Sequence, residues 1–188
     1  MDKTGLKQQA LFMRTSLLHE GYLDEQFIQL EELEDDVNPN FVEEIVTLFY
    51  SDSVRLIYNI ERALITNPPN FTKLDDYMHQ FKGSCSSIGA KKVMNECTRF
   101  SEYCAAENFE GCFRTFQQIN LEYTTLKRKL ETYLQVSLLV SFSVSKGKQL
   151  KLDGNHIGCW YPIRKVVQAH QNTGPIRSST VMYYTIKE

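Results

Sequence analysis

The sequence lacks a long apolar run, a secretory leader and paired cysteine motifs. Every apolar stretch is far shorter than the ~20 residues that a membrane-spanning helix needs. No positively charged and then apolar leader opens the chain, because Met1 is followed by Asp2, Lys3 and a polar stretch. We therefore expect a protein of the cytoplasm or nucleus that neither spans a membrane nor is secreted. At 188 residues, the chain is long enough for one domain, or for one domain with an appendage.

The cysteines do not form a disulfide framework or a zinc motif. The chain has five cysteines, an odd number, and no two of them form a Cys-x-x-Cys pair. Without such a pair, we expect no metal site. We expect buried thiols that act as small apolar side chains. The five residues are Cys85, Cys97, Cys104, Cys112 and Cys159.

The net charge of −2 hides an acidic body and a basic end. Residues 1–135 contain 14 Lys and Arg against 21 Asp and Glu, a net −7, whereas residues 136–188 contain 7 against 2, a net +5. An acidic body argues against a general nucleic-acid-binding protein, which needs a basic surface. The change of sign near residue 136 indicates a boundary.

Apolar residues recur with helical spacing through the first 135 residues, and no strand pattern interrupts them. Two shorter helices are predicted first, one stopped by Gly21 and one capped by Asp24. Four longer helices follow, and the first of them starts at Asn38-Pro39, a capping side chain followed by a proline at the first helical position. The expected inward residues are Leu6, Ala10, Met13 and Leu17; Phe27, Leu30 and Leu33; Val42, Ile45, Phe49, Leu56, Ile60 and Ala63; Leu74, Met78, Phe81, Cys85 and Ile88; Val93, Cys97, Phe100 and Cys104; and Cys112, Phe116, Ile119, Tyr123, Leu126, Leu130 and Tyr133.

The predicted fold class is all-α, because four amphipathic helices joined by short turns pack most simply as an antiparallel, up-down-up-down bundle. Residues 1–37 would form two N-terminal helices that cover the bundle, and residues 38–135 would form the bundle itself. Residues 136–188 are β-branched at first and then rich in Gly, Asn and Pro, with no helical period and no matched strands. Since a single unpaired strand is not stable alone, we expect this C-terminal tail to be poorly ordered.

The residues around His79 bear most directly on function. On a helix, Asp75, His79, Lys82, Gly83 and Ser86 share one outward stripe beside the apolar stripe. A side chain at position 83 would lean back over His79. Glycine there leaves the imidazole open to a large partner, although it costs the helix roughly 1 kcal/mol relative to alanine. Lys82 can bring a positive charge to an anion on His79, and Ser86 keeps the face shallow.

An exposed imidazole without a pocket can act as a base, bind a metal or accept a phosphoryl group. A base needs a nucleophile to activate and a metal needs further ligands, and the stripe offers no cysteine or second histidine. A phosphoryl acceptor needs only access, a neutral ring nitrogen and compensation of the phosphate charge. On spacing alone, an ordinary solvated face is the simpler interpretation, with Gly83 serving only to let two helices pack closely.

The run HQFKGSCSSIGA, which begins at His79, resembles the phosphorylation motif of the plant histidine-containing phosphotransfer proteins. The front of that family is similar to two further stretches, GYLDEQFIQLEEL and NPNFVEEIVTLFYSDS. Its last bundle helix resembles the stretch TLKRKLETYLQ, and the likeness as a whole covers about residues 4–135. The resemblance implies that His79 is the phosphorylated residue and that Lys82 and Gly83 flank it in space. Gln80 matches the glutamine of the motif, whereas Ser86 is placed at the site only by the helical stripe.

A two-component phosphorelay is the function that the resemblance implies. A sensor histidine kinase, typically a cytokinin receptor, passes phosphate to an aspartate in its receiver domain, and the receiver hands it to His79. The protein then carries it to the receiver domain of a response regulator in the nucleus. It would be a monomeric carrier of cytoplasm and nucleus rather than a free-standing enzyme, with no cofactor of its own, because the receiver supplies the carboxylates and Mg²⁺. Docking should be transient, through a modest interface.

Two other functions compete with that of a phosphorelay carrier. One is a non-phosphorylated helical adaptor that binds receiver domains and competes with true carriers; the family contains pseudo-members without the histidine, whereas this chain has His79. The other is a hydrolase, for which the sequence offers no pair of nucleophile and base.

The tail has no counterpart in the family pattern. The junction Gln135-Val136-Ser137 can be encoded as CAG-GTA-AGT, which matches a plant splice-donor site, so we hypothesise that residues 136–188 are translated intron. A genuine basic tail that binds an acidic partner is the rival interpretation.

Overall fold

The computed structural model describes residues 3–35 and 37–148, with side chains for residues 4–35 and 37–141. This part of the chain contains helices and no strand, which confirms the all-α prediction. None of these helices is both long and apolar enough to cross a membrane. The helices are α1 (Lys3–His19), α2 (Glu25–Glu32), α3 (Phe41–Leu64), α4 (Phe71–Ser87), α5 (Lys91–Ala105) and α6 (Phe109–Lys148).

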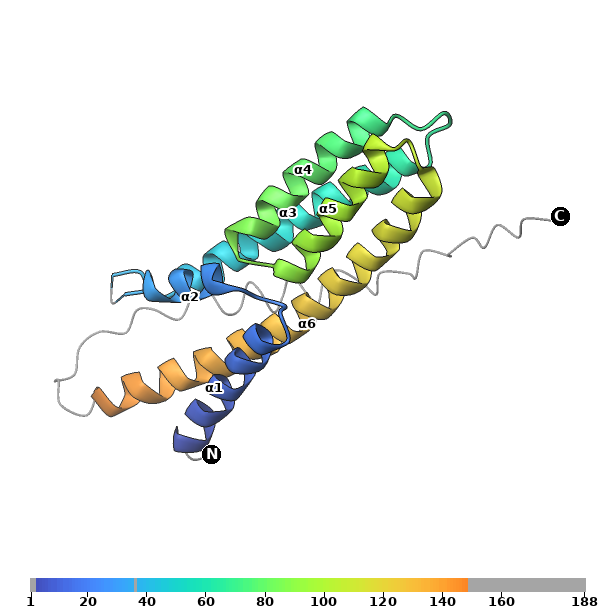
Figure 1. Cartoon of the computed structure of the whole chain (residues 1–188). Coiled ribbons are helices and arrows are strands. Elements are labelled where there is room, and N and C mark those ends of the chain that lie inside the picture. The colour runs from blue at the N-terminus through green and yellow to red at the C-terminus, as the bar shows by residue number, and fades with distance from the viewer. Residues whose placement is uncertain (1–2, 36, 149–188) are drawn as a thin grey trace, which may run out of the picture. The chain divides into compact units, whose positions relative to one another are not determined.

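Helices α3 to α6 form the predicted antiparallel four-helix bundle. Figure 1 shows them side by side, joined by short turns at alternating ends, with α1 along the far part of α6 and α2 at one end of the bundle. The inward stripes of all four helices meet in one apolar core. Phe49, Phe81 and Phe100 are almost completely buried there, and Tyr123 packs edge-on against both Phe49 and Phe81. The periodicity of the sequence therefore specifies the bundle.

The start of α2 is hydrogen-bonded to the turn between α4 and α5. The Asp24 side chain accepts a hydrogen bond from the backbone N–H of Gln26, and so caps α2 as predicted. The backbone N–H of Asp24 donates to the carbonyl of Gly89 at 3.0 Å. Gly89 has φ +69°, and a Cβ there would lie 2.2 Å from Asp24 Oδ1. Only glycine fits this turn, because it tolerates the left-handed backbone and lacks the clashing atom.

A polar cluster links the N-terminal helices to α6. Glu31 on α2 accepts hydrogen bonds from Arg14 Nε of α1 at 2.6 Å and from the Tyr133 hydroxyl of α6 at 2.5 Å. The Tyr133 ring also packs edge-on against Phe27. Charge-assisted hydrogen bonds of this kind have a defined geometry, so the cluster sets how α1 and α2 lie on α6.

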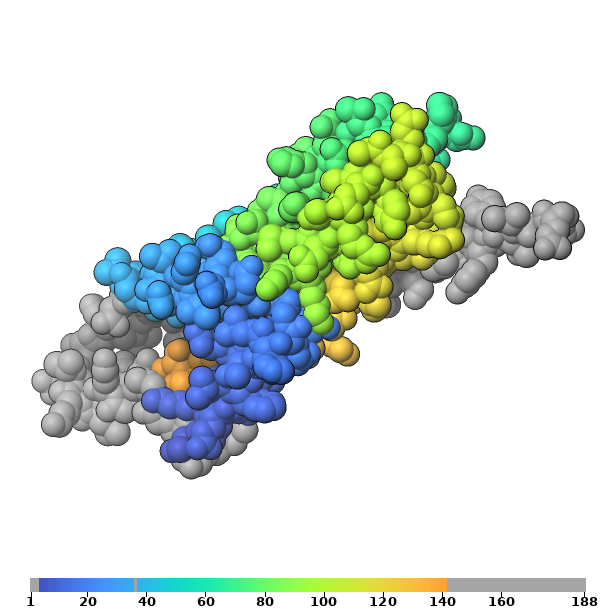
Figure 2. Space-filling model, in the orientation of Figure 1, coloured from blue at the N-terminus to red at the C-terminus, as the bar shows by residue number. Residues whose placement is uncertain are grey.

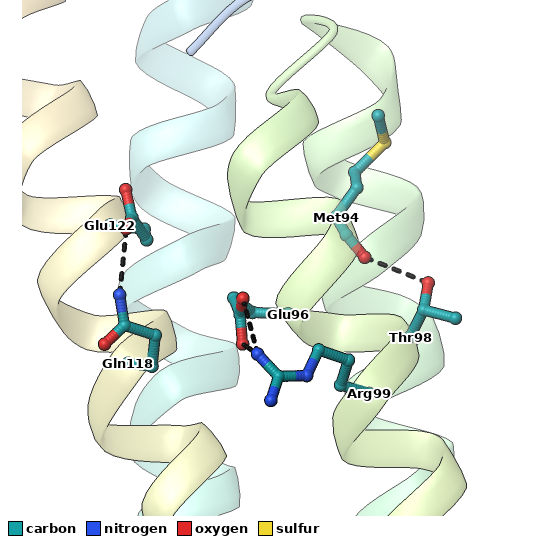
Figure 3. Close-up of polar contacts among 6 residues, drawn as sticks. All are labelled: Met94, Glu96, Thr98, Arg99, Gln118 and Glu122. Atoms are coloured by element: carbon teal, nitrogen blue, oxygen red, sulfur yellow. Dashed lines mark hydrogen bonds and ion pairs between the residues drawn. The ribbon is translucent and has the colours of Figure 1, made fainter. Parts of the chain in front are cut away.

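Figure 3 shows polar contacts within single helices, on α5 and on α6. Arg99 pairs with both oxygens of Glu96 at 3.1 and 3.2 Å, and Gln118 donates to Glu122 at 2.9 Å. An exposed ion pair contributes about 0–1 kcal/mol, whereas burying one large apolar side chain contributes about 1.5–3 kcal/mol. The core, rather than these surface pairs, therefore holds the bundle together.

Two local predictions are wrong at the junction of α2 and α3. Leu33 was expected to face inward, but it follows the end of α2 and is 63% exposed. Helix α3 was expected to begin at Asn38-Pro39, but it begins at Phe41, with Asn40 as a cap that makes no side-chain hydrogen bond. Residues 38–40 instead form a turn, closed by a hydrogen bond from Phe41 N–H to the Asn38 carbonyl.

The expected loss of order after Gln135 is wrong for residues 136–148, which continue α6 to Lys148. Val136 takes the next inward position after Tyr133 and is 9% exposed. Extending an existing helix adds one hydrogen bond for each residue that is fixed. The weak helix propensity of β-branched residues, a few tenths of a kcal/mol each, does not outweigh that gain. Residues 149–188, and with them the rest of the tail prediction, lie outside the described residues.

Candidate phosphoacceptor site on α4

Helix α4 presents His79 to solvent on the side away from its buried stripe. Asn70 caps the helix, since its side chain accepts a hydrogen bond from the backbone N–H of Lys73 at 2.9 Å. Met78 and Phe81 are completely buried and fix the rotation of the helix in the bundle. His79, next to Met78, is therefore exposed. The predicted accessibility of the imidazole is confirmed.

Gly83 leaves open space where a side chain would stand. It lies one helical turn after His79, it is exposed, and a Cβ built on it would meet no atom of the described residues within 4 Å. The alternative that Gly83 lets two helices pack closely is therefore wrong, because no neighbouring helix of the described part of the chain comes within 4 Å of that Cβ. A glycine that weakens a helix interior by about 1 kcal/mol without a packing reason points to a role in access.

The other predicted site residues lie around His79 at different depths. Lys82 is half-buried, so its aliphatic part rests on the protein while its ammonium group can reach solvent. Ser86 is exposed two turns after His79 on the same stripe. Gln80 is exposed as well, but it is about 100° further around the helix, so it borders the stripe rather than belonging to it.

Asp75 is a member of the stripe for which the sequence suggested no role. It lies one turn before His79 and is half-buried, and its Oδ1 atom is buried without a hydrogen-bond partner among the described residues. Asp75 is also close enough to Cys104 of α5 for its charge to contribute to the raised pKa of that thiol. The stripe thus carries a negative charge on one side of His79 and the positive charge of Lys82 on the other.

A groove of about 460 Å³ continues the His79 face toward the start of α2. Ser86 belongs both to the groove and to the stripe. Figure 2 shows that α4 and α5 lie together on one open face, with the segment that leads into α2 next to them. The sequence could not reveal this groove, because residues from three separate helices form it. Its lining residues are Asp24, Glu25, Gln26, Ser86, Lys91 and Met94.

The chemistry of the site is that of a single nucleophile on an open surface. No group of three or more His, Cys, Asp or Glu side chains in the described part of the chain is arranged to hold a metal ion. His79 offers an exposed ring nitrogen, Gly83 leaves the space beside it open, and Lys82 would bring a positive charge to an incoming anion. The site can accept a group from a partner that brings its own activating residues.

Comparison with known proteins shows the family. The Hpt domain family matches residues 44–129. The chain is 62% identical over 118 residues to histidine-containing phosphotransfer protein 4 of Arabidopsis thaliana, covering 63% of this chain and 93% of that protein. It is 49% identical over 136 residues to pseudo histidine-containing phosphotransfer protein 5 of Oryza sativa subsp. japonica, covering 72% and 90%. The crystal structure of a histidine-containing phosphotransfer protein from Medicago truncatula superposes with a TM-score of 0.70 at 40% identity, covering 73% and 94%. The chain therefore belongs to the plant histidine-containing phosphotransfer proteins.

Proposed function

We propose that His79 accepts a phosphoryl group from the aspartyl phosphate of one receiver domain and passes it to the aspartate of another. Family membership makes the protein a mediator of two-component phosphotransfer, which interacts with receiver domains. The observation that carries the assignment to His79 is its exposed imidazole, one turn before a glycine at which even a Cβ would meet nothing within 4 Å. A folded receiver domain is large, and it can reach a nucleophile only on a face as open as this one.

The transfer step needs little from this chain beyond position and charge. A ring nitrogen of neutral His79 attacks phosphorus, the new N–P bond forms, and the P–O bond to the aspartate of the receiver breaks to release its carboxylate. The other ring nitrogen keeps its proton, and Lys82 offsets part of the phosphoryl charge, which is close to −2. In this proposal the partner supplies Mg²⁺ and the acidic residues that hold it. The protein is then an intermediate of the transfer rather than a free-standing enzyme.

The relay in which this carrier would act is the more specific part of the proposal. The donor would be the receiver domain of a sensor histidine kinase of the cytokinin-receptor type, and the acceptor would be a response regulator in the nucleus. The protein would act as a monomer that moves between cytoplasm and nucleus. The partners are separate proteins. Support for this part therefore comes only from the likeness of the His79 motif to that of the plant family.

A helical adaptor that binds receivers without being phosphorylated is the second candidate. It is favoured by the similarity to rice relatives named pseudo histidine-containing phosphotransfer proteins, at 49%, 50% and 55% identity. Such an adaptor would not need His79, Lys82 or Gly83. The presence of all three, with open space at position 83, favours the carrier.

Label transfer distinguishes the two functions. The full chain is incubated with a receiver domain that carries radiolabelled phosphate, and the label bound to each protein is followed before and after treatment with acid. A carrier gains an acid-labile label that the matched variant His79→Gln does not gain. An adaptor binds the receiver in a pull-down assay but gains no label, and that result would refute the proposal.

A further inference from the structure

A pair of cysteines lies where α5 ends and α6 begins, with Cys104 close enough to Asp75 of the His79 stripe to be affected by its charge. The Sγ atoms of Cys104 and Cys112 are 3.6 Å apart, within hydrogen-bonding distance for two thiols. Cys104 is 4% exposed and Cys112 is completely buried. A disulfide has its sulfur atoms about 2.05 Å apart, so joining this pair requires a shift of little more than 1.5 Å.

The backbone around the two thiols is held in a tight turn. The N–H of Glu107 donates to the carbonyl of Cys104 at 3.0 Å, and the N–H of Cys112 donates to the carbonyl of Asn108 at 3.0 Å. The Asn108 side chain accepts from the N–H of Gly111 at 2.9 Å, which caps the first turn of α6. Both cysteines are thus fixed relative to each other by short-range hydrogen bonds, in the last turn of one helix and the first turn of the next.

The two thiols are not chemically equivalent. Burial is the largest influence on both, and it raises the pKa of Cys104 and of Cys112. For Cys112, two hydrogen bonds oppose that effect, one from the Cys104 thiol and one from its own backbone N–H. Cys112 also lies in the first turn of α6, where the helix dipole favours an anion. Cys112 is therefore the better thiolate of the pair, and Cys104 is placed to react with it.

We propose that Cys104 and Cys112 form an intramolecular disulfide when the protein meets a peroxide. The Cys112 thiolate attacks one oxygen of hydrogen peroxide, the O–O bond breaks, and Cys112 becomes a sulfenic acid while hydroxide leaves. Cys104 then attacks that sulfur, the S–S bond forms, and the sulfenic oxygen leaves as water. The hydroxide takes up the proton that the Cys112 thiol released on ionising, so the two thiols lose two electrons in total and one peroxide is reduced to two waters. Because both thiols are shielded, the reaction proceeds through brief opening of the turn and is slow.

A second thiol pair in the bundle provides an internal comparison. Both residues are completely buried, Cys85 in the last turn of α4 and Cys97 in the middle of α5, and burial, together with Cys97, raises the pKa of Cys85. Cys97 lies far from either end of α5, and the turn that follows Cys85 is buried at Ile88 and Ala90 and held by the hydrogen bond from the Asp24 N–H to the Gly89 carbonyl. We expect both thiols to stay reduced under conditions that oxidise the pair between α5 and α6.

Peptide mapping tests the pair directly. The full chain with Cys159→Ser, which prevents cross-links through that residue, is treated with hydrogen peroxide, denatured, alkylated and digested without reductant. The expected product is one cross-linked peptide pair that joins Cys104 to Cys112, lighter by two hydrogen atoms and reversed by dithiothreitol, while Cys85 and Cys97 are alkylated. Thermal unfolding of the oxidised sample should occur at a higher temperature than that of the reduced sample, because the cross-link restricts the unfolded chain.

Several results would overturn the proposal. Complete alkylation of Cys104 and Cys112 after prolonged peroxide treatment of the folded protein would do so, as would a cross-link between Cys85 and Cys97 in their place. A sulfinic or sulfonic acid at Cys112 without a disulfide would show that Cys104 does not reach it. The variant Cys104→Ala, which avoids burying a hydroxyl group, should accumulate oxidised Cys112 that a sulfenic-acid probe labels, whereas unlabelled Cys112 in that variant would contradict the assigned order.

Discussion

Substitutions at Gly83 distinguish an effect on access to the His79 imidazole from an effect on the stability of the fold. Since a Cβ at this position meets nothing within 4 Å, Gly83→Ala should be accepted without strain. Alanine in a helix interior is more favourable than glycine by up to about 1 kcal/mol. For a protein of this size, that free energy corresponds to a rise of about 2–4 °C in the unfolding temperature. Phosphotransfer to His79 should continue, because a methyl group is short.

A longer side chain at the same position should block the reaction without unfolding the protein. Leucine is also a good helix former, so Gly83→Leu should be at least as stable as the wild-type chain. Its side chain points toward the preceding turn and lies over His79. An aspartyl phosphate then cannot approach the ring nitrogen in line, so label transfer should be lost at an unchanged or higher unfolding temperature.

Gly89 provides the matched control, because its substitution should have the opposite effect. At φ +69°, a residue with a Cβ costs roughly 1–2 kcal/mol, and the added atom would also lie 2.2 Å from Asp24 Oδ1. Gly89→Ala should therefore lower the unfolding temperature while transfer per folded molecule stays near the wild-type value. Thermal unfolding and label transfer are measured on the same samples. A folded Gly83→Leu protein that accepts phosphate at the wild-type rate, or a destabilised Gly83→Ala protein, would refute the role given to this glycine.

Three further predictions concern the charge of Lys82, the identity of residue 79 and the length of the chain. Lys82→Ala should slow transfer several-fold at low salt, without abolishing it, because Lys82 offsets phosphate charge but forms no bond; an unchanged rate under these conditions would remove its role. His79→Gln should abolish labelling and change the unfolding temperature by no more than about 2 °C, since surface substitutions usually change stability by less than about 0.5 kcal/mol. A chain ending at Lys148 should unfold at the same temperature as the full chain, whereas one ending at Gln135 should unfold at a lower temperature because it loses the buried Val136. Equal unfolding temperatures for both truncations would show that the end of α6 contributes nothing.

The bundle could be predicted from the sequence because each of its helices repeats an apolar stripe that is complete within the helix itself. Residues Leu74, Met78, Phe81, Cys85 and Ile88 all lie at inward spacing, and all are completely buried. The exposure of His79 follows from that same stripe. These features depend on residues three and four positions apart, which a sequence shows directly.

Features that depend on contacts between distant segments could not be predicted. The fit of Gly89 against Asp24 joins residues far apart in the sequence, and local spacing gives no sign of it. The extension of α6 through Val136 depends on burial that local composition does not report. The open space at Gly83 could be predicted only in part. The stripe places Gly83 next to His79, but only the packing of the other described helices shows that they leave the position uncovered.

Locating the phosphoryl group on this chain is the most direct test of the proposed carrier. The full chain is incubated with a phosphorylated receiver domain, held at neutral or alkaline pH to preserve a phosphohistidine, and sequenced by tandem mass spectrometry; a second, unphosphorylated receiver is then added. We expect a single phosphoryl group on the peptide that contains His79, which disappears as the aspartate of the second receiver becomes phosphorylated. A phosphoryl group on any other residue, or one on His79 that the second receiver cannot remove, would contradict the role of this protein as a phosphorelay carrier.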